Sequence, residues 1–161
     1  MTMTIETRIV RTAPGMDFDV SVAGDPNRPL VLMLHGFCVS RHYWDAQAVA
    51  LAEAGYFAAA PNQRGYAPGA RPDPAEHANY TIDVLIGDAM AIVAGLGHGE
   101  RRFHLAGHNW GGSHRRSLAR AVGLANHAVA SASAGVQPRP AGGPGAADAL
   151  RSSQMAAGSL G

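Results

Sequence analysis

The hydrophobic pattern of this chain contains three short apolar stretches, at residues 29–35, 56–61 and 102–106. The first of them includes an uninterrupted apolar run from Leu30 to Leu34, which leaves no polar face. Such a run is typical of a strand that is covered by helices on both sides of its sheet. We therefore predict a buried strand in each of the three stretches.

Helical patterns separate these stretches. Residues 81–96 carry apolar side chains at helical spacing, and residues 41–54 predict a shorter helix with one apolar side. Residues 7–12 and 17–23 alternate partly between apolar and polar positions, which predicts an antiparallel hairpin at the edge of a sheet. Because strands that alternate with helices form parallel sheets with right-handed crossovers, we expect an α/β fold, with a mostly parallel sheet flanked by helices.

The composition changes sharply near Gly112. All ten aromatic residues and 11 of the 12 acidic residues lie before this glycine. The remainder is rich in alanine, glycine, serine and arginine, and it offers little large apolar surface to offset the entropy lost on ordering. We therefore expect a partial domain over residues 1–112 and a low-complexity tail over 113–161, helical at its start and disordered over 138–161.

Two explanations of this tail stay open. One is a change of reading frame, or a truncation of the gene, just after Gly112, since aromatic residues, isoleucine and acids become scarce together there. A genuine low-complexity tail or linker is the other explanation. Translation of the coding DNA in the other two frames distinguishes them.

Charge, length and cysteine content restrict the classes of function. A chain of 161 residues suits one domain at most. Its net charge is +1 and all 13 basic residues are arginine, a balance that indicates neither a nucleic-acid nor a membrane partner. No apolar run is long enough to span a membrane, and the single cysteine, Cys38, has no partner for an internal disulfide. We expect a cytoplasmic protein.

The candidate site follows the third apolar stretch. Gly107, Asn109 and Gly111 stand at alternate positions there, and Gly112 comes next. This spacing is typical of a sharp turn from a strand into a helix, which presents the central side chain over the end of the sheet beside free helix N–H groups. An ordinary loop asparagine is the alternative. The same glycines fit neither a phosphate-binding loop nor a dinucleotide fingerprint, so we expect no cofactor. His104 and His108 have the spacing of metal ligands only on a helix, and His104 is expected in a strand, so we expect no metal.

Three motifs occur in a recognisable order: His35-Gly36-Phe37, the Pro-Asn-Gln-Arg-Gly-Tyr segment at 61–66, and the Gly-His-Asn-Trp-Gly-Gly segment at 107–112. Together they resemble α/β-hydrolase fold enzymes, and the third is most similar to the corresponding motif of epoxide hydrolases and haloalkane dehalogenases. The resemblance implies that Asn109 occupies the nucleophile position on an elbow, and that the N–H groups of Phe37 and Trp110 form an oxyanion hole. The supporting residues that it implies are His35, Gly36, Gly107, His108, Gly111 and Gly112.

The resemblance also implies a reaction. In such enzymes an aspartate attacks a carbon of a small apolar organic substrate, and water hydrolyses the resulting ester with the help of a histidine. Asn109 is a neutral carboxamide instead, and no residue after 112 fits the late acid and histidine of the family. We therefore expect a truncated and largely inactive hydrolase. The alternative is a non-catalytic binding module, or a remnant, on hydrolase architecture.

Further expectations follow from the resemblance. Asn62 and Cys38 stand where the family leads us to expect aspartate and proline. His35 and His108 are interpreted as braces for the two loops rather than as catalytic groups. Since the family adds strands beyond the one at 102–106, that strand is expected to lie unpaired at the sheet edge and to favour self-association.

Overall fold

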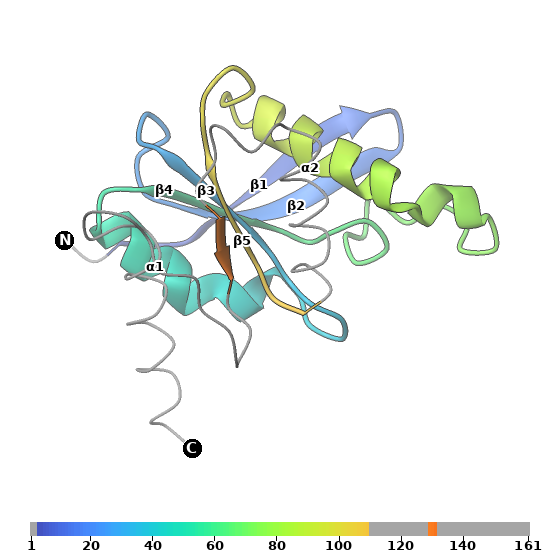
Figure 1. The fold of residues 1–161 in the computed structure, drawn as a ribbon, viewed down its shortest axis with the longest axis horizontal. Helices are drawn as coiled ribbons and strands as arrows, with labels where there is room; N and C mark the ends of the chain where they lie inside the picture. Colours follow the sequence, from blue (N-terminus) through green and yellow to red (C-terminus); the bar gives the residue numbers. More distant parts are fainter. Residues whose placement is uncertain (1–2, 110–128, 132–161) are drawn as a thin grey trace.

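A six-stranded sheet forms the centre of the fold (Figure 1). The computed structural model describes residues 3–109 and 129–131. Within them the strands lie in the order β1-β2-β4-β3-β5-β6. They are β1 (Glu6–Ala13), β2 (Met16–Ala23), β3 (Leu30–Leu34), β4 (Phe57–Pro61), β5 (His104–Gly107) and β6 (Val129–Ser131). Strands β4, β3, β5 and β6 are parallel, whereas β2 is antiparallel to both β1 and β4. The expected α/β class is confirmed.

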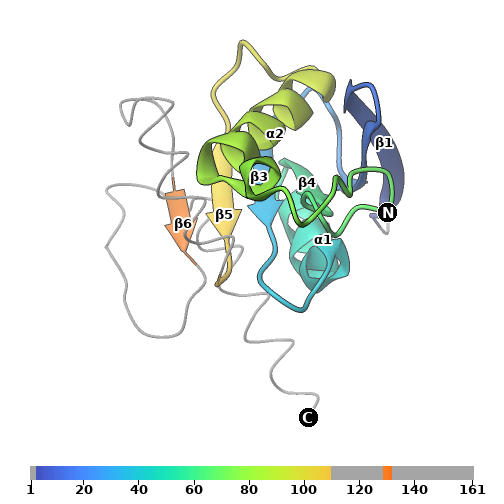
Figure 2. The same ribbon diagram turned by 90° about the vertical axis from the view of Figure 1, so that its right-hand side faces the viewer.

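Strand β3 lies between β4 and β5, and all five of its residues are buried. Leu32 belongs to one apolar cluster and Met33 to another, because successive side chains of a strand point to opposite faces. Helix α2 (Ile82–Gly95) contributes to the cluster of Leu32, and helix α1 (Asp45–Glu53) to that of Met33. The two helices therefore cover opposite faces of the sheet (Figures 1 and 2).

The predicted elements agree with the structure to within about two residues at most ends. The hairpin is formed by β1 and β2, as expected. The helix expected over 41–54 begins as a 3-10 turn, η1 (Arg41–Trp44), before α1 starts. A second 3-10 turn, η2 (His77–Tyr80), precedes α2 and was not expected.

The expectation of an unpaired strand at 102–106 is wrong. Residues Leu105 to Gly107 of β5 pair in parallel with Val129 to Ser131 of β6. Strand pairing depends on backbone N–H and C=O groups, so a segment with small side chains can supply it without a strong apolar pattern. The open edge that was to favour self-association is therefore not at β5, and self-association itself stays a prediction. The expected boundary at residue 112 and the expected disorder over 138–161 lie outside the described residues.

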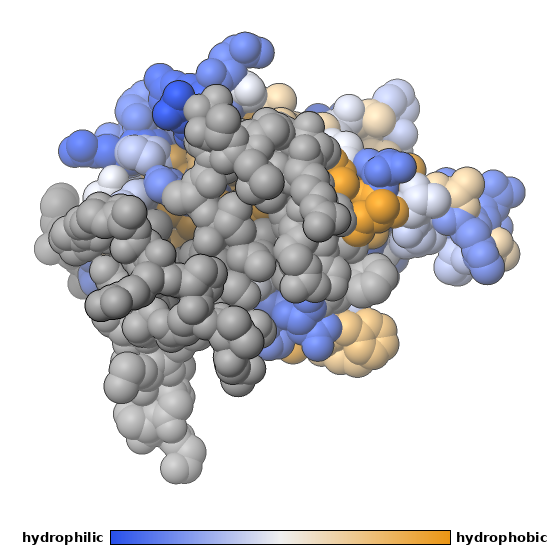
Figure 3. All heavy atoms as spheres, in the orientation of Figure 1, coloured by the Kyte–Doolittle hydropathy of each residue, from blue (hydrophilic) through white to orange (hydrophobic). Residues whose placement is uncertain are grey.

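Exposed apolar side chains are few on the described part of the chain. Hydrophilic residues occupy much of the described surface that is visible in Figure 3. The large apolar side chains that are exposed are Met3, Ile9, Phe37, Tyr43 and Ile82. None of the described helices is long and apolar enough to cross a membrane.

The parallel strands place three loops at one edge of the sheet. Residues 35–40 follow β3, residues 62–71 follow β4, and residues 108–109 follow β5. Since the carboxyl ends of parallel strands meet at the same edge, the described residues of the three sequence motifs come together there.

Candidate active site

Asn109 lies just beyond the carboxyl end of β5, and its side chain is exposed. The residue before it continues the strand ladder, since His108 N–H donates to the carbonyl of Leu34 at 3.1 Å. The φ angle of Asn109 is 51°, in the left-handed region that residues other than glycine seldom occupy. The residue lies at the same sheet edge as the loop after β3.

Gly36 makes the contact between the two loops. A Cβ atom at this position would lie 2.9 Å from Asn109 Cβ, 2.9 Å from His108 Nδ1 and 3.1 Å from the His108 carbonyl. Only glycine fits such a close approach of two backbones. Next to it, the Phe37 side chain is 72% exposed, and no described residue accepts a hydrogen bond from Phe37 N–H. A backbone donor without a partner among the described residues thus lies one residue away from the contact with Asn109.

His35 is fully buried behind this loop, and both of its ring nitrogens are in use. Nε2 accepts a hydrogen bond from Gln63 N–H at 3.1 Å, so Nδ1 carries the ring proton and donates it to the Gly36 carbonyl at 2.9 Å. Burial lowers the pKa of His35, because desolvation disfavours the charged ring. His35 therefore braces the loop in its neutral form and has no nitrogen left for proton transfer.

His108 is held differently. Its ring stacks on the ring of Tyr43 from η1, with the centroids 4.7 Å apart and the planes at 25°. Its Nδ1 atom is buried and has no hydrogen-bond partner in the described part of the chain. The contacts of His108 are thus those of a packed residue at the base of the turn.

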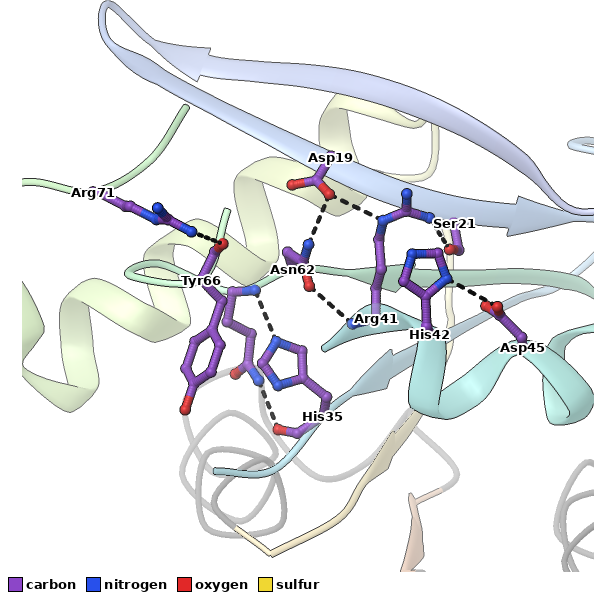
Figure 4. A network of polar contacts seen from close by, with 10 residues as sticks. Asp19, Ser21, His35, Arg41, His42, Asp45, Asn62, Tyr66 and Arg71 are labelled. Atoms are coloured by element: carbon purple, nitrogen blue, oxygen red, sulfur yellow. Dashed lines mark hydrogen bonds and ion pairs between the residues drawn. The ribbon is translucent and has the colours of Figure 1, made fainter. Parts of the chain in front are cut away.

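A polar network ties the start of η1 to strand β2 and to the loop after β4 (Figure 4). Asp19 Oδ2 accepts hydrogen bonds from Arg41 Nε at 3.0 Å and from Asn62 Nδ2 at 2.7 Å. Asn62 Oδ1 accepts in turn from Arg41 N–H at 2.8 Å, and the Arg41 guanidinium also donates to Ser21 Oγ. The side chains of Arg41 and Asp19 are only 12% and 17% exposed. Asn62 is therefore the neutral bridge between a carboxylate and a backbone N–H.

The turn over residues 62–67 is anchored to helix α2. Arg64 forms two hydrogen bonds with the carboxylate of Asp88, at 2.6 and 2.7 Å, and the side chains of both residues are 12% exposed. The hydrogen bond to Asp88 raises the pKa of Arg64. From this turn the hydroxyl of Tyr66 accepts a hydrogen bond from Cys38 N–H at 3.2 Å. Sequence reasoning missed these partners, although Arg64 and Tyr66 stood within a motif that it had singled out.

A depression of about 710 Å³ opens beside the loop after β3. It is wide open to solvent and is therefore a surface depression rather than an enclosed cavity. Neither Phe37 nor Asn109 lines it, and Cys38, which does, is an exposed free cysteine with a φ angle of 63°. The lining residues are Cys38, Val39, Ser40, His42, Tyr43, Asn62, Tyr66 and Arg71.

Several expected site residues lie outside the described part: Trp110, Gly111 and Gly112. Of the others, the structure brings together His35, Gly36, Phe37, His108 and Asn109, while Gly107 is the last residue of β5. Among the described residues no group of three or more histidine, cysteine, aspartate or glutamate side chains is arranged to hold a metal ion.

Comparison with known proteins agrees with this architecture. The chain is 38% identical over 97 residues to epoxide hydrolase A of Mycobacterium tuberculosis, and the matched region covers 60% of this chain and 29% of that protein. It is 38% identical over 93 residues to a fluoroacetate dehalogenase of a Burkholderia species, over 56% of this chain and 30% of the relative. The crystal structure of an epoxide hydrolase from Vigna radiata superimposes with a TM-score of 0.69 at 34% identity, over 85% of this chain and 40% of the other.

The chain thus spans about a third of the length of the curated relatives it matches. Residues 29–134 match the alpha/beta hydrolase fold family. These residues include the strands β3, β4, β5 and β6 and all three loops of the candidate site. The chain belongs to the alpha/beta hydrolase fold family.

Proposed function

We propose that this chain carries the first part of an epoxide-hydrolase-like active site, and that it turns over no epoxide or alkyl halide by itself. Asn109 occupies the nucleophile position of an elbow, and the N–H groups of Phe37 and Trp110 are the donors of an oxyanion hole. Relatives that are named epoxide hydrolases and a dehalogenase support the class of reaction. The substrate class is a small apolar organic molecule.

The observation that supports this site most strongly is the contact of two loops at Gly36. This contact brings Gly36 against Asn109, which has a left-handed φ angle and lies at the carboxyl end of β5. The N–H of the residue after Gly36, Phe37, has no partner among the described residues. Donors aimed at the place where negative charge develops are the usual means of stabilising a transition state in acyl transfer. The arrangement therefore suits a reaction at residue 109.

The identity of Asn109 argues for inactivity. A carboxylate oxygen attacks carbon because it carries a full negative charge, whereas the lone pair of a carboxamide is delocalised. Hydrolysis of an ester intermediate also needs a general base, and both nitrogens of the buried His35 are committed to the loop. Asn109 therefore does not provide the nucleophile of the first step, and His35 does not provide the general base of the second.

A binding module without catalysis is the second candidate. The depression of about 710 Å³ favours it, because it is large enough for a small organic molecule and lies next to the Phe37 loop without including Asn109. Such a module would bind the same class of compound and release it unchanged.

Assays with a chromogenic epoxide and a haloalkane distinguish these possibilities. The proposal predicts turnover no faster than in buffer, and turnover clearly above buffer would contradict it. Amide chemical shifts recorded with a non-reactive diol give the second comparison. Shifts confined to residues 38–43 and 62–71 favour the binding module, whereas shifts at Phe37 and Asn109 favour the remnant active site.

A further inference from the structure

The orientation of the Phe37 N–H group is not fixed by the Phe37 side chain. That side chain is 72% exposed and packs into neither apolar cluster of the core. A peptide unit is planar, so this N–H shares its plane with the Gly36 carbonyl, which accepts a hydrogen bond from His35 Nδ1 at 2.9 Å. Its direction also depends on the peptide units on either side, so the His35 ring and the residues that hold those neighbouring units decide together where the donor points.

One turn, residues 62–67, holds both neighbours. On one side, Gln63 donates through its backbone N–H to the His35 ring at 3.1 Å and through its side chain to the His35 carbonyl at 2.7 Å. On the other side, Tyr66 accepts a hydrogen bond from Cys38 N–H at 3.2 Å. The ring of Tyr66 also meets the ring of His35 edge to face, with centroids 4.7 Å apart.

We propose that Tyr66 is a positioning residue whose hydroxyl, by holding Cys38 N–H, sets the direction of the Phe37 N–H together with the His35 ring on the Gly36 carbonyl. This inference rests on the proposed function, because it takes the Phe37 N–H as an oxyanion donor. It assigns a role to a side chain that does not touch the reacting atoms and that acts only through the backbone of the loop.

The backbone at residue 38 is what makes this contact possible. Cys38 has a φ angle of 63° and donates its N–H to Tyr66. Proline, which the resemblance leads us to expect at this position, has no N–H and is confined to a φ angle near −65°. The Tyr66 contact is therefore a device of this chain, created by a residue that keeps its amide and accepts a left-handed conformation.

The turn is rigid enough to serve as a template. Arg64 donates from Nε and from one terminal guanidinium nitrogen to the two carboxylate oxygens of Asp88 on α2. Gly65 has a φ angle of 86°, donates its N–H to the Ala70 carbonyl at 2.9 Å, and leaves no room for a Cβ atom without a shift of the Tyr80 ring. A hydroxyl on such a support can fix a flexible loop, whereas a mobile one cannot.

Hydrogen exchange and amide chemical shifts of the whole chain test the inference. Tyr66→Phe removes the hydroxyl and keeps the ring against His35. We expect the Cys38 amide to exchange about fivefold faster, the effect of losing one hydrogen bond of ordinary strength. The Phe37 amide resonance should shift, whereas exchange in β3 and β4 should stay as in the wild type.

Two variants serve as controls. Tyr80→Phe removes a tyrosine hydroxyl that donates to the Pro72 carbonyl at 2.8 Å, and Cys38→Ala removes the thiol but keeps the amide. Both should leave the exchange of the residue 38 amide unchanged. Unaltered Cys38 exchange and an unaltered Phe37 resonance in Tyr66→Phe would overturn the inference, and so would an equal acceleration in β3 and β4. These readouts do not depend on chemistry at Asn109, so failure of the proposed function is seen separately.

Discussion

Replacing Asn62 by aspartate tests whether the site depends on a neutral residue opposite Asp19. Asn62 Nδ2 lies 2.7 Å from Asp19 Oδ2, which Arg41 Nε approaches at 3.0 Å. The substitution Asn62→Asp exchanges the donor for an oxygen, so two carboxylates would share one arginine. The side chain of Asp19 is 17% exposed, and water screens such a pair only in part.

The expected loss of unfolding free energy has two parts. A hydrogen bond to a charged group contributes about 1.5–3 kcal/mol. Two like charges about 4 Å apart repel by about 4 kcal/mol at an effective dielectric constant of about 20, and Arg41 offsets part of this. We therefore expect Asn62→Asp to lower the free energy of unfolding by about 2–4 kcal/mol at pH 7.5.

The pH dependence has a defined sign. The second charge raises the pKa of one carboxyl in the folded variant above its unfolded value near 4. The folded variant then binds more protons than the unfolded chain, so the loss is complete at pH 7.5 and shrinks as the pH falls towards about 4.

Urea unfolding at pH 7.5 and pH 4.5 measures both effects. The double variant Asp19→Asn with Asn62→Asp again has one carboxylate and one carboxamide beside Arg41, and it should recover most of the stability. Asn27→Asp is a matched control, because Asn27 Nδ2 lies 3.0 Å from Asp25 Oδ1 in an exposed pair; it should cost less than about 1 kcal/mol. Wild-type stability of Asn62→Asp at pH 7.5, or a double variant no more stable than the single one, would refute the reasoning.

Three further predictions concern stability. Because burial lowers the pKa of His35, the unfolded chain takes up a proton below about pH 6.5 that the folded one resists; urea titrations should show stability falling from that pH downwards, and a flat profile would contradict a His35 that is buried in its neutral form. Gly36→Ala should overpack the loop contact, cost about 1–3 kcal/mol of unfolding free energy and lower the melting temperature. Gly87→Ala, in open space on α2, should raise the melting temperature slightly, and equal effects of the two variants would argue against the loop contact. Arg64→Ala should cost about 3 kcal/mol in urea unfolding by leaving Asp88 buried without its partner, and a loss under 1 kcal/mol would show that the pair anchors nothing.

Much of the fold was predictable because it follows from local patterns. The apolar run of β3 and the helical period of α2 each reflect burial on a defined number of faces. Strand β6 was missed because Val129 to Ser131 are too few and too small to give such a pattern, and only their pairing with β5 identifies them. The 3-10 start of α1 at Arg41 was missed because the network with Asp19 decides it.

The candidate site was predictable to the same extent. The motifs identified His35, Gly36 and Asn109. A close approach of two backbones requires glycine, and glycines at alternate positions around residue 109 are the pattern expected for an exposed side chain at the end of a strand. The partners Asp19 and Asp88 were not identified, because each lies more than 20 residues from the group it binds. Long-range polar contacts leave no periodic signal in one sequence.

The identity of residue 109 is the centre of the proposed function, and the variant Asn109→Asp tests it with a reactive aryl epoxide. The new carboxylate oxygen would attack an epoxide carbon, the ring C–O bond would break, and the ring oxygen would take a proton from water to leave a hydroxyalkyl ester. The exposed thiol of Cys38 also reacts with epoxides, so the site of addition is located by peptide mass spectrometry. Hydroxylamine cleaves the ester and leaves a thioether intact, which separates the two products.

The decisive measurement is the hydroxylamine-sensitive mass increase on the peptide that contains residue 109, in freshly purified wild type and in Asn109→Asp, with Cys38 alkylation as the internal reference. The account predicts an adduct at residue 109 in the variant, stable because the described residues supply no base to hydrolyse it, and none in the wild type, with equal alkylation of Cys38 in both. A folded variant without an adduct at residue 109, or a wild type that carries the same adduct, would contradict it.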